Sequence, residues 1–289
     1  RFNSCFKMYQ AVEKGSTYDQ SYRIFLTKDN VPISYFHDVP LYATEDKLTF
    51  NMIVEIPRWS NAKMEISTKE PLNPIKQDVK NDKLRFVCNS FPHHGYIWNY
   101  GALPQTWEYP EHIDDATGKK GDNDPIDIID IGTVIPKRGE IIQVKILGSI
   151  ALIDEGETDW KLIAINVNDP IAAQLKDFTD VEEHCPGLLK ATLEWFRIYK
   201  IPDGKPENLF GLMGEIQNVE DTLKVIDQVH QFWSDLVAKR IDNTYGIDCS
   251  STVLEDSPSK IDEDAAKAIL DEQPNFVERP MPDEIKEKL

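Results

Sequence analysis

The sequence predicts an α+β fold that is mainly β, with a compact barrel core, flanking strands and two or three helices. Short β-rich segments, separated by Gly, Pro and other turn residues, run through residues 22–165, as is typical of a closed or nearly closed barrel. Helical periodicity appears only after residue 187. The 289 residues, of which 40% are hydrophobic, are enough to bury one sizeable core.

The predicted strands lie in the first two thirds of the chain. Between residues 22 and 56 short runs alternate with polar turns, and the run at 50–56 stops at Pro57. Side chains alternate along a strand, so Lys63 and Glu65 share one face of the run at 62–66. Further strands are expected at 126–129, 141–147, 150–153 and 162–165.

Three segments have helical character. Residues 188–199 place apolar side chains at helical spacing, and residues 221–239 form the clearest amphipathic helix. The apolar face of this helix consists of Leu223, Ile226, Val229, Trp233 and Leu236. Residues 251–289 are acidic, with few large apolar groups, and hold one short helical segment at 264–271.

The charge balance excludes several classes of function. The chain has 32 Lys and Arg against 50 Asp and Glu, a formal charge of −18. This excess disfavours nucleic acids and anionic membranes as partners, since both select basic surfaces. No apolar run approaches the ~20 residues that a membrane-spanning helix needs. Phosphorylated small molecules remain open, because metal ions can reverse the local charge.

The sharpest local signal is the segment at 121–127, which contains Asp122, Asp124 and Asp127. Pro125 prevents a helix here, so the three carboxylates lie on a turn that runs into a strand. Carboxylates this close repel one another unless a cation holds them, and oxygen ligands suit Mg²⁺, Mn²⁺ or Ca²⁺. The segment does not fit a calcium loop, which requires Gly where Asp127 stands. A solvated acidic turn is the alternative.

A second acidic segment, at 154–161, joins two apolar runs and predicts a hairpin. A surface charge run accounts for Glu155 and Glu157. It accounts less well for Asp159 and Lys161, which are two residues apart and therefore share a strand face. An acid beside a base is the combination that a metal–phosphate site requires.

The remaining candidates are cationic or phenolic: Arg85, Tyr96, Tyr100, Tyr199 and Lys200. Singly, each fits an ordinary structural role, such as a half-buried Tyr or a Lys at a helix C-terminus. The sequence has no phosphate-binding loop, dinucleotide fingerprint, zinc-protease helix or serine elbow.

The segment at 121–127 resembles the D-x-D-P-x-D signature of the family I soluble inorganic pyrophosphatases. Further segments at 54–59, 61–65, 91–101, 154–161 and 196–208 resemble the eukaryotic members, in the family's order. Agreement of several separated segments is far more specific than any one of them. The resemblance implies an OB-like five-stranded β-barrel and the Mg²⁺-dependent hydrolysis of pyrophosphate to two orthophosphates.

The resemblance also assigns roles to the candidate residues. The implied metal ligands are Asp122, Asp127, Asp154, Asp159 and Glu65. The implied substrate-binding residues are Lys63, Arg85, Tyr96, Lys161, Tyr199 and Lys200. The implied catalytic residues are Asp124, as general base, and Arg85, Tyr100, Lys63 and Glu55. A metal-activated water would attack phosphorus directly and in line. Mn²⁺, Co²⁺ or Zn²⁺ are expected substitutes for Mg²⁺, and Ca²⁺ an inhibitor.

The expected organisation has three parts: an N-terminal extension at 1–20, one pyrophosphatase catalytic domain at 21–245 and a loosely packed acidic tail at 246–289. The family resemblance implies a homodimer, with Arg58, Trp59 and His94 as interface candidates. We expect a cytoplasmic protein. A mitochondrial location stays open because the sequence begins at Arg1 rather than Met. Two alternative functions also stay open: a non-enzymatic assembly subunit on this fold and a broader phosphohydrolase acting on nucleotides or polyphosphate.

Overall fold

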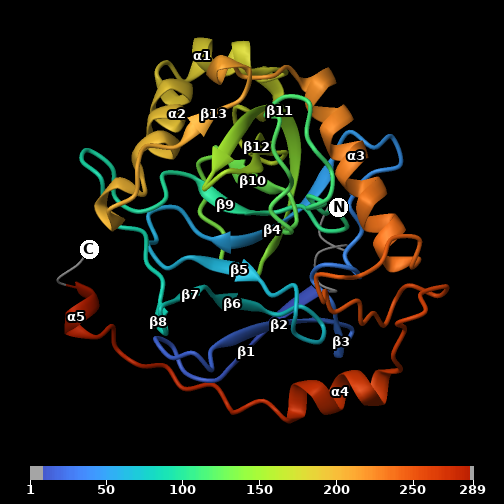
Figure 1. Ribbon diagram of the computed structural model, residues 1–289. Coiled ribbons are helices and arrows are strands. Elements are labelled where there is room, and N and C mark those ends of the chain that lie inside the picture. Colours follow the sequence, from blue (N-terminus) through green and yellow to red (C-terminus); the bar gives the residue numbers. More distant parts are fainter. Residues whose placement is uncertain (1–8, 287–289) are drawn as a thin grey trace.

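The computed structural model describes residues 9–286, which form a barrel above a second, smaller sheet (Figure 1). Its strands are β1 (Tyr9–Lys14), β2 (Arg23–Lys28), β3 (Val31–Ile33), β4 (Phe50–Ile56), β5 (Met64–Ile66), β6 (Ile75–Gln77), β7 (Val79–Lys80), β8 (Lys83–Leu84), β9 (Asn99–Ala102), β10 (Asp127–Asp130), β11 (Ile141–Asp154), β12 (Glu157–Asn166) and β13 (Leu209–Phe210). Its α-helices are α1 (Phe178–His184), α2 (Leu188–Ile198), α3 (Val219–Val237), α4 (Glu263–Asp271) and α5 (Asp283–Lys286). Single 3₁₀ turns occur at Ala172–Gln174, Ile201–Asp203 and Leu212–Gly214.

Five strands close the predicted barrel. β4, β9 and β10 pair antiparallel in succession, β10 pairs parallel with β12, and β11 pairs antiparallel with both β12 and β4. All seven residues of β4 are buried, because the barrel interior covers one face and surrounding segments cover the other. The mainly β, α+β fold with a five-stranded barrel is therefore confirmed.

One strand differs from the sequence prediction. The runs expected at 141–147 and 150–153 form a single strand, β11, with a register irregularity between Ile146 and Gly148. A Cβ at Gly148 would lie 2.6 Å from the backbone oxygen of Gln217, so glycine allows the neighbouring chain to approach closely. The strand can then bend around the barrel without a break.

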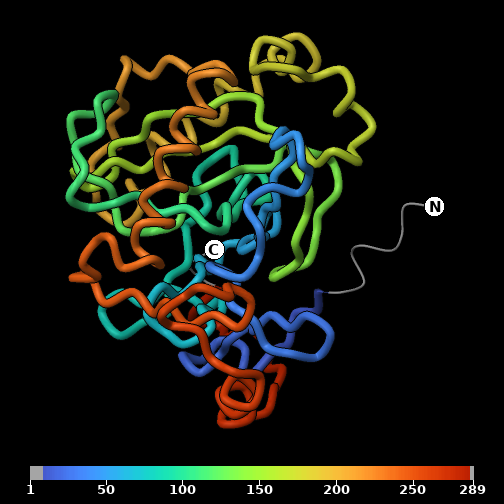
Figure 2. Tube along the Cα trace, turned by 90° about the vertical axis from the view of Figure 1, so that its right-hand side faces the viewer, coloured from blue at the N-terminus to red at the C-terminus, as the bar shows by residue number. Residues whose placement is uncertain are grey.

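The second sheet has the strand order β1-β2-β6-β5, with β3 paired to β2. In Figure 1 it lies below the barrel, and Figure 2 shows the two layers from the side. β5 carries Glu65 and follows β4 closely in the chain, so this sheet supplies one wall of the site described below.

Helices α1, α2 and α3 lie on the outside of the barrel, whereas α4 and α5 lie near the smaller sheet (Figure 1). Asn218 caps α3 by accepting a hydrogen bond from the Asp221 amide at 2.9 Å, which starts this helix earlier than the predicted residue 221. Ile226, Val229 and Trp233 are buried on its inner face, as predicted. The short helices α1 and α5, of seven and four residues, have too little periodicity to be predicted from sequence.

The N- and C-terminal segments meet along the small sheet. β1 pairs with β2 over its whole length. The Gly15 amide donates to the Pro274 carbonyl at 2.9 Å, and α4 buries Ala266 against Phe25 and Leu72. Through these contacts, segments within residues 9–20 and 246–286 pack against the smaller sheet. Residues 1–8 and 287–289 lie outside the described residues. The division into an extension, a catalytic domain and a loosely packed tail stays a prediction.

None of the helices found between residues 9 and 286 is long and apolar enough to cross a membrane.

Candidate active site

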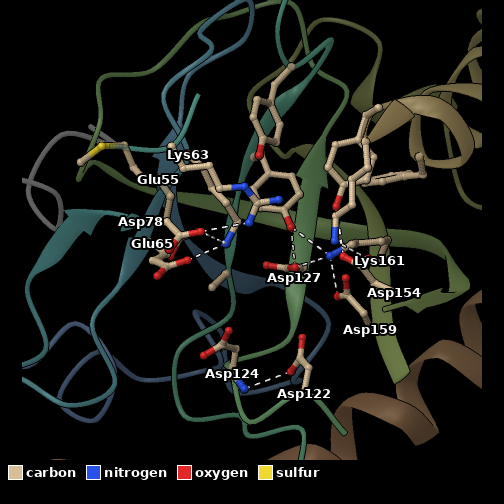
Figure 3. Close-up of a pocket in the computed structure, with 18 of the residues that line it drawn as sticks. Glu55, Lys63, Glu65, Asp78, Asp122, Asp124, Asp127, Asp154, Asp159 and Lys161 are labelled. Atoms are coloured by element: carbon tan, nitrogen blue, oxygen red, sulfur yellow. Dashed lines mark hydrogen bonds and ion pairs between the residues drawn. The ribbon is translucent and has the colours of Figure 1, made fainter. Parts of the chain in front are cut away.

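A cavity of about 370 Å³ is lined by residues of the barrel, of β5 and β7 and of the C-terminal end of α2 (Figure 3). All fourteen residues proposed from sequence as catalytic, substrate-binding or metal-binding line it: Glu55, Lys63, Glu65, Arg85, Tyr96, Tyr100, Asp122, Asp124, Asp127, Asp154, Asp159, Lys161, Tyr199 and Lys200. The fold thus brings together side chains from segments that are up to 145 residues apart.

The turn before β10 carries two of the carboxylates. The Asp124 amide donates to Asp122 Oδ1 at 3.0 Å, which fixes the turn, and Asn123 takes the left-handed conformation with φ 75°. Burial, followed by the negative charge of Glu65, raises the pKa of Asp124 to about 7. Burial and the charge of Asp159 raise the pKa of Asp122 well above its ordinary value. Figure 3 shows both residues at one side of the cavity, apart from Lys161.

Glu108 is a further acid of this site that was not singled out from sequence. One oxygen each of Glu108, Asp122 and Asp159 lie within 4.8 Å of one another. Glu108 Oε1 accepts from the Trp160 amide at 3.0 Å, while Oε2 is buried and accepts no hydrogen bond from any residue in 9–286. The local signal is weak: an acid between Trp107 and Tyr109.

This cluster fits a hard divalent cation. The three side chains offer oxygen ligands, and burial raises the pKa of Glu108 well above its ordinary value, with Asp122 adding repulsion. An unsatisfied buried oxygen calls for a partner such as an ion or water. A cation in the cluster would satisfy Glu108 Oε2 and remove the repulsion.

Lys161 is a buried cation of the cavity that contacts three neighbouring side chains. The parallel pairing of β10 and β12 places Asp127 opposite Lys161. The Lys161 ammonium, whose side chain is 3% exposed, contacts Asp127, lies 2.5 Å from Asp159 Oδ1 and donates to Tyr100 Oη at 3.0 Å. The Tyr100 hydroxyl in turn donates to Asp127. The spacing of Asp159 and Lys161 therefore does place both groups on one strand face, as predicted.

A second basic group lies on the opposite side. Lys63 Nζ is 2.5 Å from Glu65 Oε2, which confirms that these side chains share a strand face. Arg85, which follows β8 directly, donates from Nη1 to Asp78 Oδ2 at 2.9 Å. Burial opposes ionisation of Asp78, but Lys63 and Arg85 together lower its pKa below the ordinary value. Asp78 was missed in the sequence because its role depends on these long-range contacts.

The end of α2 supplies the third group. Tyr199 caps the helix and stacks on Trp195, with ring centroids 4.7 Å apart and planes 6° from parallel. Its hydroxyl donates to Asp154 Oδ2 at 3.1 Å, and Lys200 Nζ contacts Asp154 Oδ1. Lys200 Nζ also lies 3.3 Å from Glu155. The helix thus aims a phenol and an ammonium into the cavity.

Glu55 and Tyr96 are buried residues of the cavity wall. Glu55 Oε1 accepts from the Ile66 amide at 2.7 Å, which ties β4 to β5. Burial, followed by the charge of Asp127, raises the pKa of Glu55 well above its ordinary value. Burial raises the pKa of Tyr96 to about 12, so its hydroxyl keeps its proton.

The three residues suggested for a dimer interface lie outside this cavity. Trp59, which is 56% exposed, and His94 line a separate cavity of about 520 Å³, together with Met281 of the C-terminal segment. Arg58 donates to the Gly132 carbonyl, and its guanidinium lies 5.9 Å from the Trp59 ring centre. Their role in an interface stays a prediction.

Comparison with known proteins agrees with this site. Residues 52–234 match the family model described as inorganic pyrophosphatase. The inorganic pyrophosphatases of Mus musculus and Homo sapiens are 57% and 55% identical, over 92% of this chain and 91% of each relative.

Solved structures show the same fold. The inorganic pyrophosphatase of Schistosoma japonicum superposes with a TM-score of 0.90 and 50% identity, covering 94% of this chain and 96% of that one. A truncated Trypanosoma cruzi vacuolar soluble pyrophosphatase in complex with PPi superposes with a TM-score of 0.74 and 44% identity, over 81% of this chain and 92% of that one. The family model, the length of these matches and their eukaryotic sources together show that this chain belongs to the family I soluble inorganic pyrophosphatases, a family of hydrolases.

Proposed function

We propose that this protein hydrolyses inorganic pyrophosphate to two orthophosphates, with Mg²⁺ and by direct in-line attack of water. One observation carries the proposal: ten carboxylates and five cationic groups line a single cavity, within a family whose reaction is this hydrolysis. An excess of acids alone would repel pyrophosphate, whereas acids that hold cations beside lysines and an arginine would bind it.

The candidate metal ligands are Asp122, Asp127, Asp154, Asp159 and Glu65, and the structure adds Glu108. Bound Mg²⁺ would lower the pKa of a water from 15.7 towards ~7 and neutralise charge on the phosphate oxygens. Mn²⁺, Co²⁺ and Zn²⁺ share enough of this ligand chemistry to substitute. Ca²⁺ is larger and takes more ligands at longer distances, so we propose that it inhibits.

Asp124 is the proposed general base. Its carboxyl lies on the cavity wall and has a pKa raised to about 7, close to the pH at which a base accepts a proton efficiently. Glu65 and Asp127 are among the charges that keep its pKa high. The turn hydrogen bond from its own amide to Asp122 holds this residue in place.

The basic and phenolic groups are the proposed phosphate ligands. Arg85 offers a rigid fork of donors, and Lys63, Lys161 and Lys200 offer compact charges that adapt to several oxygens. Tyr96 and Tyr199 are phenols beside these bases and donate without adding charge. Tyr100 and Glu55 position the others, through the Tyr100 contact with Asp127 and the Glu55 bond to Ile66.

Two other functions are distinguished by assay. An assembly subunit without activity would not need the acids, bases and tyrosines predicted for the site, and all fourteen of these residues line the cavity. A broader phosphohydrolase would release phosphate from ATP or polyphosphate at rates similar to those from pyrophosphate.

We also propose a homodimer whose interface includes Arg58, Trp59 and His94, since Trp59 exposes a large apolar surface beside a cavity. A cytoplasmic location is proposed as well, with a mitochondrial one as the alternative. Sedimentation of the purified protein and fractionation of cells test these two points.

The direct test of the function is release of orthophosphate by the purified protein in the presence of Mg²⁺. We expect pyrophosphate to be hydrolysed much faster than ATP, and EDTA to abolish the reaction. No release from pyrophosphate would overturn the proposal, and faster turnover of ATP would favour the broader phosphohydrolase.

A further inference from the structure

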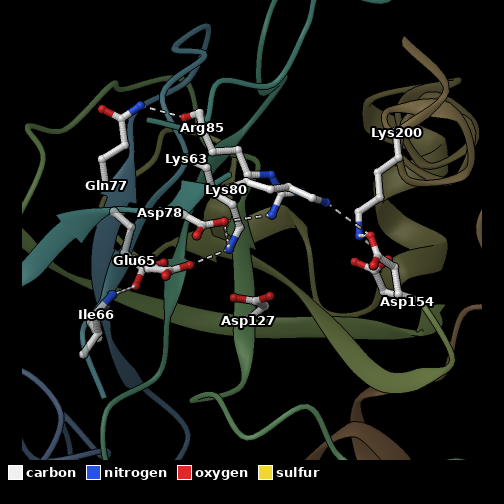
Figure 4. A network of polar contacts seen from close by, with 12 residues as sticks. Lys63, Glu65, Ile66, Gln77, Asp78, Lys80, Arg85, Asp127, Asp154 and Lys200 are labelled. Atoms are coloured by element: carbon white, nitrogen blue, oxygen red, sulfur yellow. Dashed lines mark hydrogen bonds and ion pairs between the residues drawn. The ribbon is translucent and has the colours of Figure 1, made fainter. Parts of the chain in front are cut away.

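Three ammonium groups converge on Glu155, which the proposed mechanism does not use. Glu155 Oε1 lies 3.3 Å from Lys200 Nζ and 3.7 Å from Lys80 Nζ, and Oε2 lies 3.4 Å from Lys205 Nζ. The three lysines come from the β7–β8 hairpin and from the segment after α2. Figure 4 shows the Lys80 side chain extending towards Lys200 and Asp154.

The exposure of these side chains places Glu155 at the outer end of the cavity. Lys161 and Lys200, which face the proposed phosphate positions, are 3% and 7% exposed. Glu155, Lys80 and Lys205 are 45%, 48% and 39% exposed. Lys200 is therefore a buried cation of the cavity, and Glu155, 3.3 Å from it, lies on its solvent-exposed side.

The backbone fixes this position. Glu155 and Gly156 form the two-residue turn between β11 and β12, with φ 47° and 96°, and the flanking residues Asp154 and Glu157 pair with each other. Positive φ at both turn residues is the geometry that joins antiparallel strands tightly. The carboxylate of Glu155 is thus held at the mouth by a rigid hairpin.

A carboxylate and a phosphate group offer ammonium groups similar partners. Both are anionic oxygen acceptors for ammonium groups. A linear triphosphate with two phosphates inside the cavity would have to place its third beyond Lys200. There it would meet the like charge of Glu155, and it would find Lys80 and Lys205 already paired.

We propose that Glu155 is a specificity-determining residue that occupies the position of a third phosphate and so restricts hydrolysis to pyrophosphate over linear triphosphates. The inference rests on the proposed pyrophosphatase function. A purely stabilising role is the competing explanation, but exposed ion pairs of this kind contribute little to stability. Repulsion of the wrong substrate is a common source of specificity.

The test compares Glu155→Gln with the wild type on pyrophosphate and tripolyphosphate, with Mg²⁺. We expect the ratio of kcat/KM for tripolyphosphate to that for pyrophosphate to rise about tenfold. Glu207→Gln is the matched control, because Glu207 pairs with Arg197 and neither residue lines the cavity. Adding Lys205→Ala to Glu155→Gln should remove most of the gain.

A binding measurement keeps this inference separate from the proposed function. Calorimetry with imidodiphosphate and diimidotriphosphate, in Mg²⁺, needs no turnover. We expect Glu155→Gln to favour the triphosphate analogue selectively, even if the wild type were to lack pyrophosphatase activity. An unchanged preference in both the kinetic and the binding measurement would overturn the inference. A lower melting temperature of Glu155→Gln with unchanged preference would likewise overturn it, because it would show a purely stabilising role.

Discussion

The two sides of the cavity balance their charges in different ways. On one side Asp127 and Asp159 contact Lys161, and Asp154 contacts Lys200. On the other side buried Glu108 lies close to half-buried Asp122, and Asp124 follows in the same turn; none of these three forms an ion pair within residues 9–286. The difference indicates that the protein supplies the cations of the first side, whereas the second side needs cations from solution. Asp159 belongs to both sides and links them.

The largest effect is expected from removing the proposed base on the unpaired side. Asp124→Asn keeps the shape of the side chain but cannot accept the proton, so kcat for pyrophosphate should fall by about 10²–10⁴-fold. The control is Asp227→Asn, on α3, where the carboxylate accepts from the Tyr42 hydroxyl at 3.1 Å, outside the cavity. If turnover survives in Asp124→Asn while circular dichroism shows an intact fold, Asp124 is not the base.

The ion-paired cations, which also include Lys63 beside Glu65 and Arg85 beside Asp78, should respond through the substrate rather than the metal. Arg85→Ala removes a fork of donors from the phosphate position, and we expect kcat/KM to fall by about 10²–10³-fold. For Lys63→Ala we expect a smaller decrease in kcat/KM, since only one point charge is lost. Metal binding, measured by calorimetry, should be nearly unchanged in both variants. Arg197→Ala, on the outside of α2, is the control, and an equal loss there would show that the effect is not local.

Glu108 tests whether the unpaired side is a cation site. Glu108→Gln removes one of three clustered oxygen ligands, and we expect the affinity for Mg²⁺ or Mn²⁺ to fall by about 10–100-fold. The exposed acid Glu111, which pairs with Lys120, provides the control Glu111→Gln. Unchanged metal affinity in Glu108→Gln would remove Glu108 from the site.

The smallest effect is a pH dependence of stability. The folded pKa values of Asp124 and Asp159 are raised to about 7, above the ordinary value of 3.8. Because folding favours the protonated form of these two acids, they stabilise the folded protein at low pH. This contribution to stability is lost as the pH rises through about 7. Bound metal ions should offset this loss. They add about 2.7 kcal/mol to the free energy of unfolding when the metal concentration is a hundredfold above its dissociation constant. The increase in Tm on adding Mg²⁺ should therefore grow between about pH 5 and pH 8. A Mg²⁺-induced rise in Tm that stays the same or becomes smaller over this pH range would contradict the prediction.

The barrel was largely predictable because most of its strands have a clear local pattern. β4 matches the expected run at 50–56, and the β11–β12 hairpin joins two apolar runs through an acidic turn. β9 was not predicted, because Asn99–Ala102 has no β-rich pattern. It depends on Gly101, where a Cβ would lie 1.8 Å from the Ile53 carbonyl oxygen. That requirement exists only once the barrel is closed.

The site was predictable to the extent that its residues belong to recognisable motifs. The segments at 121–127 and 154–161 contain five of the seven predicted site acids together with Lys161. Asp78 and Glu108 belong to no motif, since one is defined by contact with Arg85 and the other by the Trp160 amide. Glu155 was explained as part of a surface charge run, and only the positions of Lys80, Lys200 and Lys205 give it a more specific interpretation.

The division of the cavity into a cation-dependent side and a lysine-paired side is tested most directly by calorimetric titration with imidodiphosphate. With ten carboxylates against five cationic groups, the metal-free cavity should repel this anion. We predict binding that tightens as Mg²⁺ is raised and is at least about 100-fold weaker in EDTA, a difference of ~2.7 kcal/mol. Equal affinity with and without Mg²⁺ would contradict the account.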